Sequence, residues 1–183
     1  VRLSLKEHRV DTRLLLESKK THTAYSAILL MPNGERTIFV FRGASASLVP
    51  AHVAWKNIQA DWMYIASVGG NMPLLKRLFD HAKKNNIRIA WNPGKQELNG
   101  GVRALESFIR HASVFNVNKE EAELLLDQKA DVSALMKTLS HIGNAIVVVT
   151  DGMNGAFVSS NSEIRWSEAS KDTPVNRTGA GDA

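Results

Sequence analysis

The sequence of 183 residues contains no cysteine, which excludes disulfide bonds and any chemistry that needs a thiolate. It contains no apolar run near the roughly 18 residues that a transmembrane helix requires. Residues 1–7 also lack the apolar stretch of a secretory signal. These absences favour a cytoplasmic protein that has no membrane partner.

A basic stripe is also missing, although the formal net charge is +5. The cationic pairs Lys19-Lys20, Lys76-Arg77 and Lys83-Lys84 are scattered along the chain. Aromatic residues do not alternate with them, as they do on many nucleic-acid-binding surfaces. We therefore expect solvated helix faces and no nucleic-acid partner. The histidines, likewise, show no spacing typical of metal ligands.

Short apolar strands alternate with amphipathic helices from residue 61 onward, and this alternation predicts an α/β fold. The run Ile146-Val147-Val148-Val149 is typical of a central parallel strand covered on both faces. With 44% hydrophobic residues, the chain can bury a core of its own. We predict three α/β/α layers around a mainly parallel sheet, with strands at 62–67, 87–91, 114–117 and 145–150.

A β-hairpin is predicted ahead of this region. The strand-forming runs 23–31 and 37–41 flank Pro32-Asn33-Gly34-Glu35, a segment with the residue types of a turn. A second hairpin is predicted from Ala156 to Trp166.

The C-terminal segment Gly179-Ala180-Gly181-Asp182 carries the strongest chemical pattern. Two glycines free the backbone to aim several N–H groups at one point, and a carboxylate follows at once. Amides that stabilise an anion, beside a carboxylate that accepts a proton, suit phosphoryl transfer to a hydroxyl. A glycine-rich loop with an Asp helix cap would have the same residues, so this segment alone leaves both interpretations open.

Polar segments also follow the predicted strands directly. Each is, by itself, an ordinary helix cap or turn. Because the carboxyl ends of parallel strands share one edge of a sheet, together they predict a binding site there. The segments are Gly69-Gly70-Asn71, Asn92-Pro93-Gly94, Asn118-Lys119-Glu120-Glu121 and Thr150-Asp151-Gly152.

Three motifs occur in the order and at the spacing of a known family: Asn118-Lys119-Glu120-Glu121, Thr150-Asp151-Gly152-Met153-Asn154-Gly155 and Thr178-Gly179-Ala180-Gly181-Asp182. On these residues the chain resembles the ribokinase-like (PfkB) carbohydrate kinases, which phosphorylate sugar or nucleoside hydroxyls with ATP and Mg²⁺. The resemblance spans nearly the whole chain and implies the ribokinase-like fold. It also implies that the hairpin around residues 33–44 contributes to a lid.

The resemblance implies that Asp182 is the catalytic base, which accepts the proton of the substrate hydroxyl. The backbone N–H groups of Gly179, Ala180 and Gly181 would form the anion hole for the transferring phosphoryl group.

The nucleotide would be bound by Thr150, Gly152, Gly155 and Thr178, and Asn118 would orient its phosphates.

Glu121 would hold Mg²⁺ through water. The spacing of Asn118 and Glu121 also fits a capping box at a helix start, and the two roles can coexist. Asn176 stands where many members have an Asp that helps to bind a monovalent cation such as K⁺. Asn keeps the oxygen ligand but loses the charge, so K⁺ activation is the least supported of these expectations.

We divide the chain into a hairpin region, 1–44, which is partly lid, and an α/β nucleotide-binding and catalytic core, 45–183, which is incomplete. Family members typically run to about 300 residues, and the opening strands and main sugar contacts have no counterpart here. The resemblance therefore implies that the isolated chain is a weak or inactive kinase. It leaves open the identity of the sugar or nucleoside and whether the protein is a homodimer.

The competing interpretation is a non-catalytic nucleotide-binding or scaffold fragment of the same fold. The presence of both Asp182 and Glu121 argues against it, because a module that only binds needs neither carboxylate.

Overall fold

The computed structural model describes residues 1–31, 36–143, 145–160 and 163–170. The chain divides into two compact units, Val1–Gln59 and Ala60–Ala183. Within the described residues, no helix has both the length and the apolar character to span a bilayer.

The first unit contains the predicted hairpin, formed by the antiparallel strands β1 (Tyr25–Leu30) and β2 (Arg36–Phe41). Tyr25 pairs with Phe41, and their ring centroids are 5.1 Å apart. None of the described residues of this unit is buried. The predicted turn, 32–35, lies outside the described residues. The other elements are α1 (Arg2–Glu7) and short 3-10 turns at Gly43–Ser47, Pro50–His52 and Trp55–Asn57.

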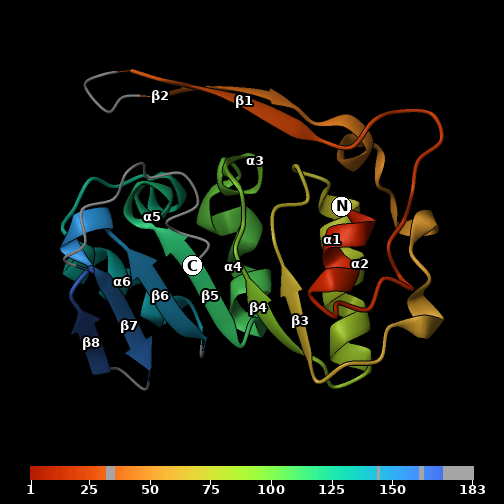
Figure 1. Cartoon of the computed structure of the whole chain (residues 1–183). Coiled ribbons are helices and arrows are strands. Elements are labelled where there is room, and N and C mark those ends of the chain that lie inside the picture. Colours follow the sequence, from red (N-terminus) through yellow and green to blue (C-terminus); the bar gives the residue numbers. More distant parts are fainter. Residues whose placement is uncertain (32–35, 144, 161–162, 171–183) are drawn as a thin grey trace. The chain divides into compact units, whose positions relative to one another are not determined.

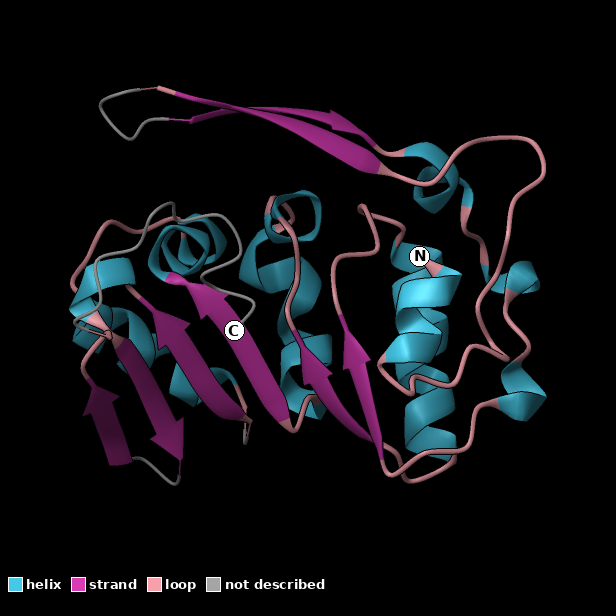
Figure 2. Cartoon of the chain, in the orientation of Figure 1, coloured by secondary structure: helices cyan, strands magenta, loops and turns pink. Residues whose placement is uncertain are grey.

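The second unit is built on a six-stranded sheet in which the strands follow one another in chain order, β3 to β8 (Figures 1 and 2). The strands are β3 (Trp62–Ile65), β4 (Arg88–Trp91), β5 (Val114–Asn118), β6 (Ile146–Thr150), β7 (Ala156–Ser160) and β8 (Glu163–Ser167). The strands β3 to β6 are parallel, whereas β7 and β8 continue the sheet as an antiparallel hairpin. The predicted α/β class with a mainly parallel sheet is confirmed, as are the four predicted parallel strands.

Helices connect the parallel strands, and side chains cap several of their first turns. Asn71 Oδ1 accepts a hydrogen bond from Leu74 N at 3.0 Å, and Asp131 Oδ1 accepts one from Ala134 N at 2.9 Å. Such caps satisfy N–H groups that have no partner within the helix. The helices are α2 (Met72–Lys84), α3 (Lys95–Leu98), α4 (Gly101–His111), α5 (Lys119–Leu126) and α6 (Val132–Ile142).

The core lies between these helices and one face of the sheet. Side chains that alternate along the parallel strands are buried there: Ile65, Ile89, Trp91, Phe115, Val117, Val147 and Val149. Trp91 and Phe115 are fully buried, with ring centroids 5.6 Å apart. On the opposite face Tyr64 is 67% exposed and Ile146 39% exposed. The one-sided burial follows from strands added in a single direction by right-handed connections.

Replacing Phe115 by Ala should lower the free energy of unfolding by about 3–5 kcal/mol, because the fully buried ring leaves a cavity. Tyr64→Ala, on the exposed face of β3, should cost less than about 1 kcal/mol. Urea unfolding followed by circular dichroism measures both. Equal losses for the two variants would contradict the assignment of the core to one face.

Candidate active site

Two of the predicted motifs meet at the carboxyl edge of the parallel sheet. β5 ends at Asn118 and β6 at Thr150, and the register makes these two residues Cα partners on neighbouring strands. The predicted placement of Asn118 and Thr150 along one edge is therefore confirmed. The segments that follow β3 and β4 lie at the same edge, because all four strands point the same way.

Asn118 and Glu121 form a reciprocal capping box at the start of α5. Asn118 Oδ1 accepts a hydrogen bond from Glu121 N at 2.8 Å, and Asn118 N donates to Glu121 Oε2 at 2.9 Å. The capping box predicted from the spacing of Asn118 and Glu121 is thus confirmed. It is compatible with a role of the same residues in binding. The box fixes the Glu121 carboxylate but engages only Oε2, so Oε1 has no hydrogen-bond partner among the described residues.

The Glu121 carboxyl is half-buried, and this burial raises its pKa above the ordinary value. The hydrogen bond from Asn118 N opposes the shift, and the nearby charge of Glu120 adds to it. No cluster of three or more His, Asp or Glu side chains with metal-ligand geometry occurs in the described ranges. One carboxylate with a free oxygen fits Mg²⁺, which keeps several waters and takes few protein ligands.

The segment after β6 forms a tight loop around the short 3-10 turn Gly152–Asn154. Asp151 N donates to Gly155 O at 2.9 Å, and Gly155 N donates to Gly152 O at 3.1 Å. Gly152 and Gly155 have φ of +53° and +90°, values that side-chain-bearing residues rarely adopt. A Cβ on Gly155 would also collide with the carbonyl group of Ser167, whereas one on Gly152 would meet open space.

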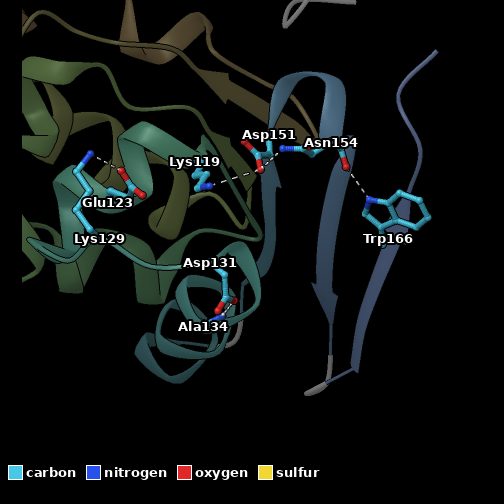
Figure 3. A network of polar contacts seen from close by, with 8 residues as sticks. All are labelled: Lys119, Glu123, Lys129, Asp131, Ala134, Asp151, Asn154 and Trp166. Carbon is cyan, nitrogen blue, oxygen red and sulfur yellow. Dashed lines mark hydrogen bonds and ion pairs between the residues drawn. The ribbon is translucent and has the colours of Figure 1, made fainter. Parts of the chain in front are cut away.

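A polar network joins this loop to α5 and to β8 (Figure 3). Lys119 Nζ lies 3.8 Å from Asp151 Oδ2, which also accepts a hydrogen bond from Asn154 Nδ2 at 3.0 Å. Asn154 O in turn accepts one from Trp166 Nε1 at 2.8 Å. Sequence reasoning did not single out Lys119 or Asp151. The signal was present, because each directly follows one of the register partners, Asn118 and Thr150.

Two surface hollows flank these motifs. One, of about 570 Å³, runs along the length of α5, from Asn118 at its start to Lys129 beyond its end, and is also bordered by Lys95. The other, of about 380 Å³, lies beside the glycine loop and is lined in part by Met153, Asn154 and Trp166. The first is polar and charged, and the second presents the large apolar surfaces of Met153 and Trp166.

Sequence reasoning missed Glu97, whose carboxylate lies under the same edge with a residue exposure of only 2%. It accepts hydrogen bonds from the segments that follow β3 and β4. Nothing in the local sequence distinguishes Glu97 from a surface residue of a short helix.

The predicted anion hole and base are Gly179, Ala180, Gly181 and Asp182. These residues lie outside the described residues, as do Thr178 and Asn176.

In open parallel α/β sheets, ligands bind past the carboxyl ends of the strands, which is where the capped start of α5 and the glycine loop lie. The profile of the pfkB family of carbohydrate kinases matches residues 1–183. The chain belongs to this family.

The chain is 25% identical over 181 residues to a ribokinase of Staphylococcus aureus (strain COL), an alignment that covers 94% of this chain and 57% of that protein. Among solved structures, it resembles a Burkholderia thailandensis nucleoside kinase in complex with inosine, with a TM-score of 0.81 at 14% identity. That match covers 99% of this chain and 59% of the other.

It also resembles a fructokinase of Vibrio cholerae O395 in a form with bound fructose, ADP and calcium ion, with a TM-score of 0.78 at 19% identity. That match covers 100% of this chain and 62% of the other. These likenesses establish the ribokinase-like fold. The chain spans about three fifths of the length of these proteins.

Gly155→Ala should destabilise the protein by more than Gly152→Ala, although both glycines have positive φ. Gly152→Ala meets only the backbone penalty of about 1–2 kcal/mol, whereas Gly155→Ala adds the collision with Ser167. Thermal unfolding of the two variants measures the difference. Equal or reversed losses would show that the loop does not have this conformation in solution.

Proposed function

We propose that the protein containing this sequence transfers the γ-phosphoryl group of ATP to a hydroxyl group of a sugar or nucleoside. The observation that carries the proposal is the pairing of Asn118 and Thr150 in register at the carboxyl edge of the sheet. It brings the capping box and the glycine loop, two motifs typical of the family, to a single site. Membership of a family of carbohydrate kinases supports the same reaction.

In this proposal ATP lies across the ends of β5 and β6. Thr150, Gly152 and Gly155 line the nucleotide, with Thr178 from the C-terminal motif. The flat base fits the hollow beside Met153 and Trp166, where exposed apolar surface is available for stacking. The ADP in the fructokinase from Vibrio cholerae is consistent with a nucleotide site in this fold.

The phosphates then lie toward the start of α5. Asn118 orients them, and Glu121 holds Mg²⁺ through water by its free carboxylate oxygen. Mg²⁺ held there would supply positive charge that offsets the negative charge of the phosphates. Asn176 is a weaker candidate for holding K⁺, because it offers an oxygen without a charge.

Asp182 is the proposed base. As the acceptor oxygen forms its bond to the γ-phosphorus, its proton passes to the Asp182 carboxylate. The bond from phosphorus to the β–γ bridging oxygen breaks, and that oxygen leaves on ADP. The N–H groups of Gly179, Ala180 and Gly181 stabilise the charge on the transferring group. A cytoplasmic location and a homodimeric state complete the proposal.

Asp182→Asn in the full-length protein should lower kcat at least about 10²-fold, because Asn cannot accept the proton. The Kd for ATP should stay within about threefold, since the base contacts the acceptor and not the nucleotide. A coupled assay of ADP release over a panel of sugars and nucleosides measures kcat, and calorimetry measures Kd.

Near-normal turnover of this variant would remove Asp182 from the mechanism. Binding of ATP by the wild-type protein without turnover on any acceptor would favour a non-catalytic nucleotide-binding module instead.

Glu121→Gln should separate the metal role from the cap. Gln also closes capping boxes, so the free energy of unfolding should change by less than about 0.5 kcal/mol. Activity should nevertheless fall, and more Mg²⁺ should be needed for half-maximal rate, because the charge is lost.

The matched control is Asn118→Asp, which keeps an excellent cap but places a negative charge beside the phosphates. It should retain stability and bind ATP more weakly. If Glu121→Gln lost stability while its Mg²⁺ dependence stayed unchanged, the carboxylate would be only a cap.

A further inference from the structure

The carboxylate of Glu97 is buried and fully occupied by hydrogen-bond donors. Its Oε1 accepts from Val68 N at 2.9 Å and from Gly70 N at 2.8 Å. Its Oε2 accepts from Ser67 Oγ at 2.9 Å and from Gly94 N at 2.8 Å. Glu97 is the one buried side chain of an acidic or basic residue among those that the structure describes.

These donors come from two separate segments of the chain, so Glu97 cross-links them. Residues 67–70 follow β3, and Gly94 follows β4. The first segment adopts positive φ at Gly69, +67°, and at Gly70, +77°, and this conformation brings the amides of residues 68 and 70 to the same oxygen. Ser67 completes the arrangement, because its Oγ donates to Glu97 and accepts from Gly69 N at 3.1 Å.

The packing around this contact leaves no space for a larger residue. A Cβ on Gly94 would lie 2.6 Å from Ser67 Cβ and 3.1 Å from Glu97 Oε2. The neighbouring Asn92 links the segment after β4 to two other strands. Its backbone N donates to Ile65 O of β3 at 2.9 Å, and its Nδ2 donates to Asn116 O of β5 at 2.8 Å. The segments that follow β3 and β4 are thereby joined to each other and fastened to the middle of β5. We call residues 67–71 and 92–94 the shelf.

We propose that Glu97 is a positioning residue that sets the shape of the shelf on which the phosphoryl acceptor is held. This inference rests on the proposed kinase function. The nucleotide motifs lie at the ends of β5 and β6, and the hollow proposed for the base lies beyond them, beside β8. The shelf lies on the opposite side of β5, which is where an acceptor must lie to face the phosphates.

Glu97 acts through the backbone and does not touch the acceptor, because it is buried and both oxygens are occupied. All of its partners are donors, which a carboxylate matches and an amide does not. In Gln, the NH₂ group would face two donors in either orientation: Val68 N and Gly70 N, or Gly94 N and Ser67 Oγ. Glu97→Gln therefore keeps the volume of the side chain and breaks the cross-link.

The test is steady-state kinetics of the full-length protein with its best acceptor from the sugar and nucleoside panel. Glu97→Gln should raise the KM for the acceptor by about tenfold or more and lower kcat, because small displacements of a reacting group are costly. The KM for ATP should change by less than about twofold, since the nucleotide motifs lie on other strands. Ser67→Ala, which removes one donor of the set, should show the same pattern with a smaller effect.

The control is Leu105→Ala, which removes a fully buried side chain from α4, an element outside the shelf. It should lower Tm while leaving the ratio of the two KM values unchanged. If Glu97→Gln changed both KM values equally, or neither, Glu97 would not position the acceptor. If Glu97→Gln did not fold, the same criterion would apply to Ser67→Ala.

Failure of the wild-type protein to phosphorylate any acceptor would overturn the proposed function and, with it, the role of the shelf. Activity of the wild-type protein with an unchanged KM ratio in both variants would overturn the role of Glu97 alone.

Discussion

The common direction of β3 to β6 is the constraint on which the candidate site depends. Inside the sheet the strand backbones are hydrogen-bonded to one another, so polar groups become available only past the strand ends. Because each helix returns the chain to the start of the next strand, all four ends lie at one edge. Trp91 and Phe115, packed against each other beneath the sheet, hold β4 and β5 in place below that edge.

The capping box at the start of α5 contributes to folding and, in the proposed function, also to the chemistry. Asn118 and Glu121 satisfy N–H groups that the helix start would otherwise leave without partners. The same bonds fix the Glu121 side chain before any ligand arrives, so its rotamer entropy is lost during folding and not during binding. Stability and the proposed Mg²⁺ binding therefore favour the same side-chain geometry of Glu121.

Local patterns in the sequence predict the helices, the strands and the capping box. The role of Glu97 depends on contacts between residues far apart in the sequence, and local patterns do not reveal it. Apolar periodicity placed the parallel strands, and a spacing of three residues predicted the box between Asn118 and Glu121. The buried role of Glu97 could not be predicted, because most of its hydrogen-bond donors are backbone amides, which every residue except proline carries. Two of these amides belong to residues 27 and 29 positions away in the sequence. The roles of Asp182 and its neighbouring glycines rest on the resemblance to the family and stay predictions.

The nucleotide part of the proposed site, around Lys119 and Asp151, is held more weakly than the acceptor part, around Glu97. This difference suits the roles proposed for the two parts. The pair Lys119–Asp151 is partly exposed and 3.8 Å apart, and contacts of this kind contribute only about 0–1 kcal/mol. Phosphate oxygens can therefore displace it at little cost. Leaving a buried polar group without one of its hydrogen-bond partners costs about 1–3 kcal/mol, and more for a charged group, so the contacts of Glu97 persist when ligands bind. Discrimination among acceptors that differ by one hydroxyl needs fixed polar groups that are left unpaired by the wrong substrate. In the proposed arrangement, the firmly held part around Glu97 lies where the acceptor would be discriminated, and the weakly held pair Lys119–Asp151 lies where every turnover would bring the same nucleotide.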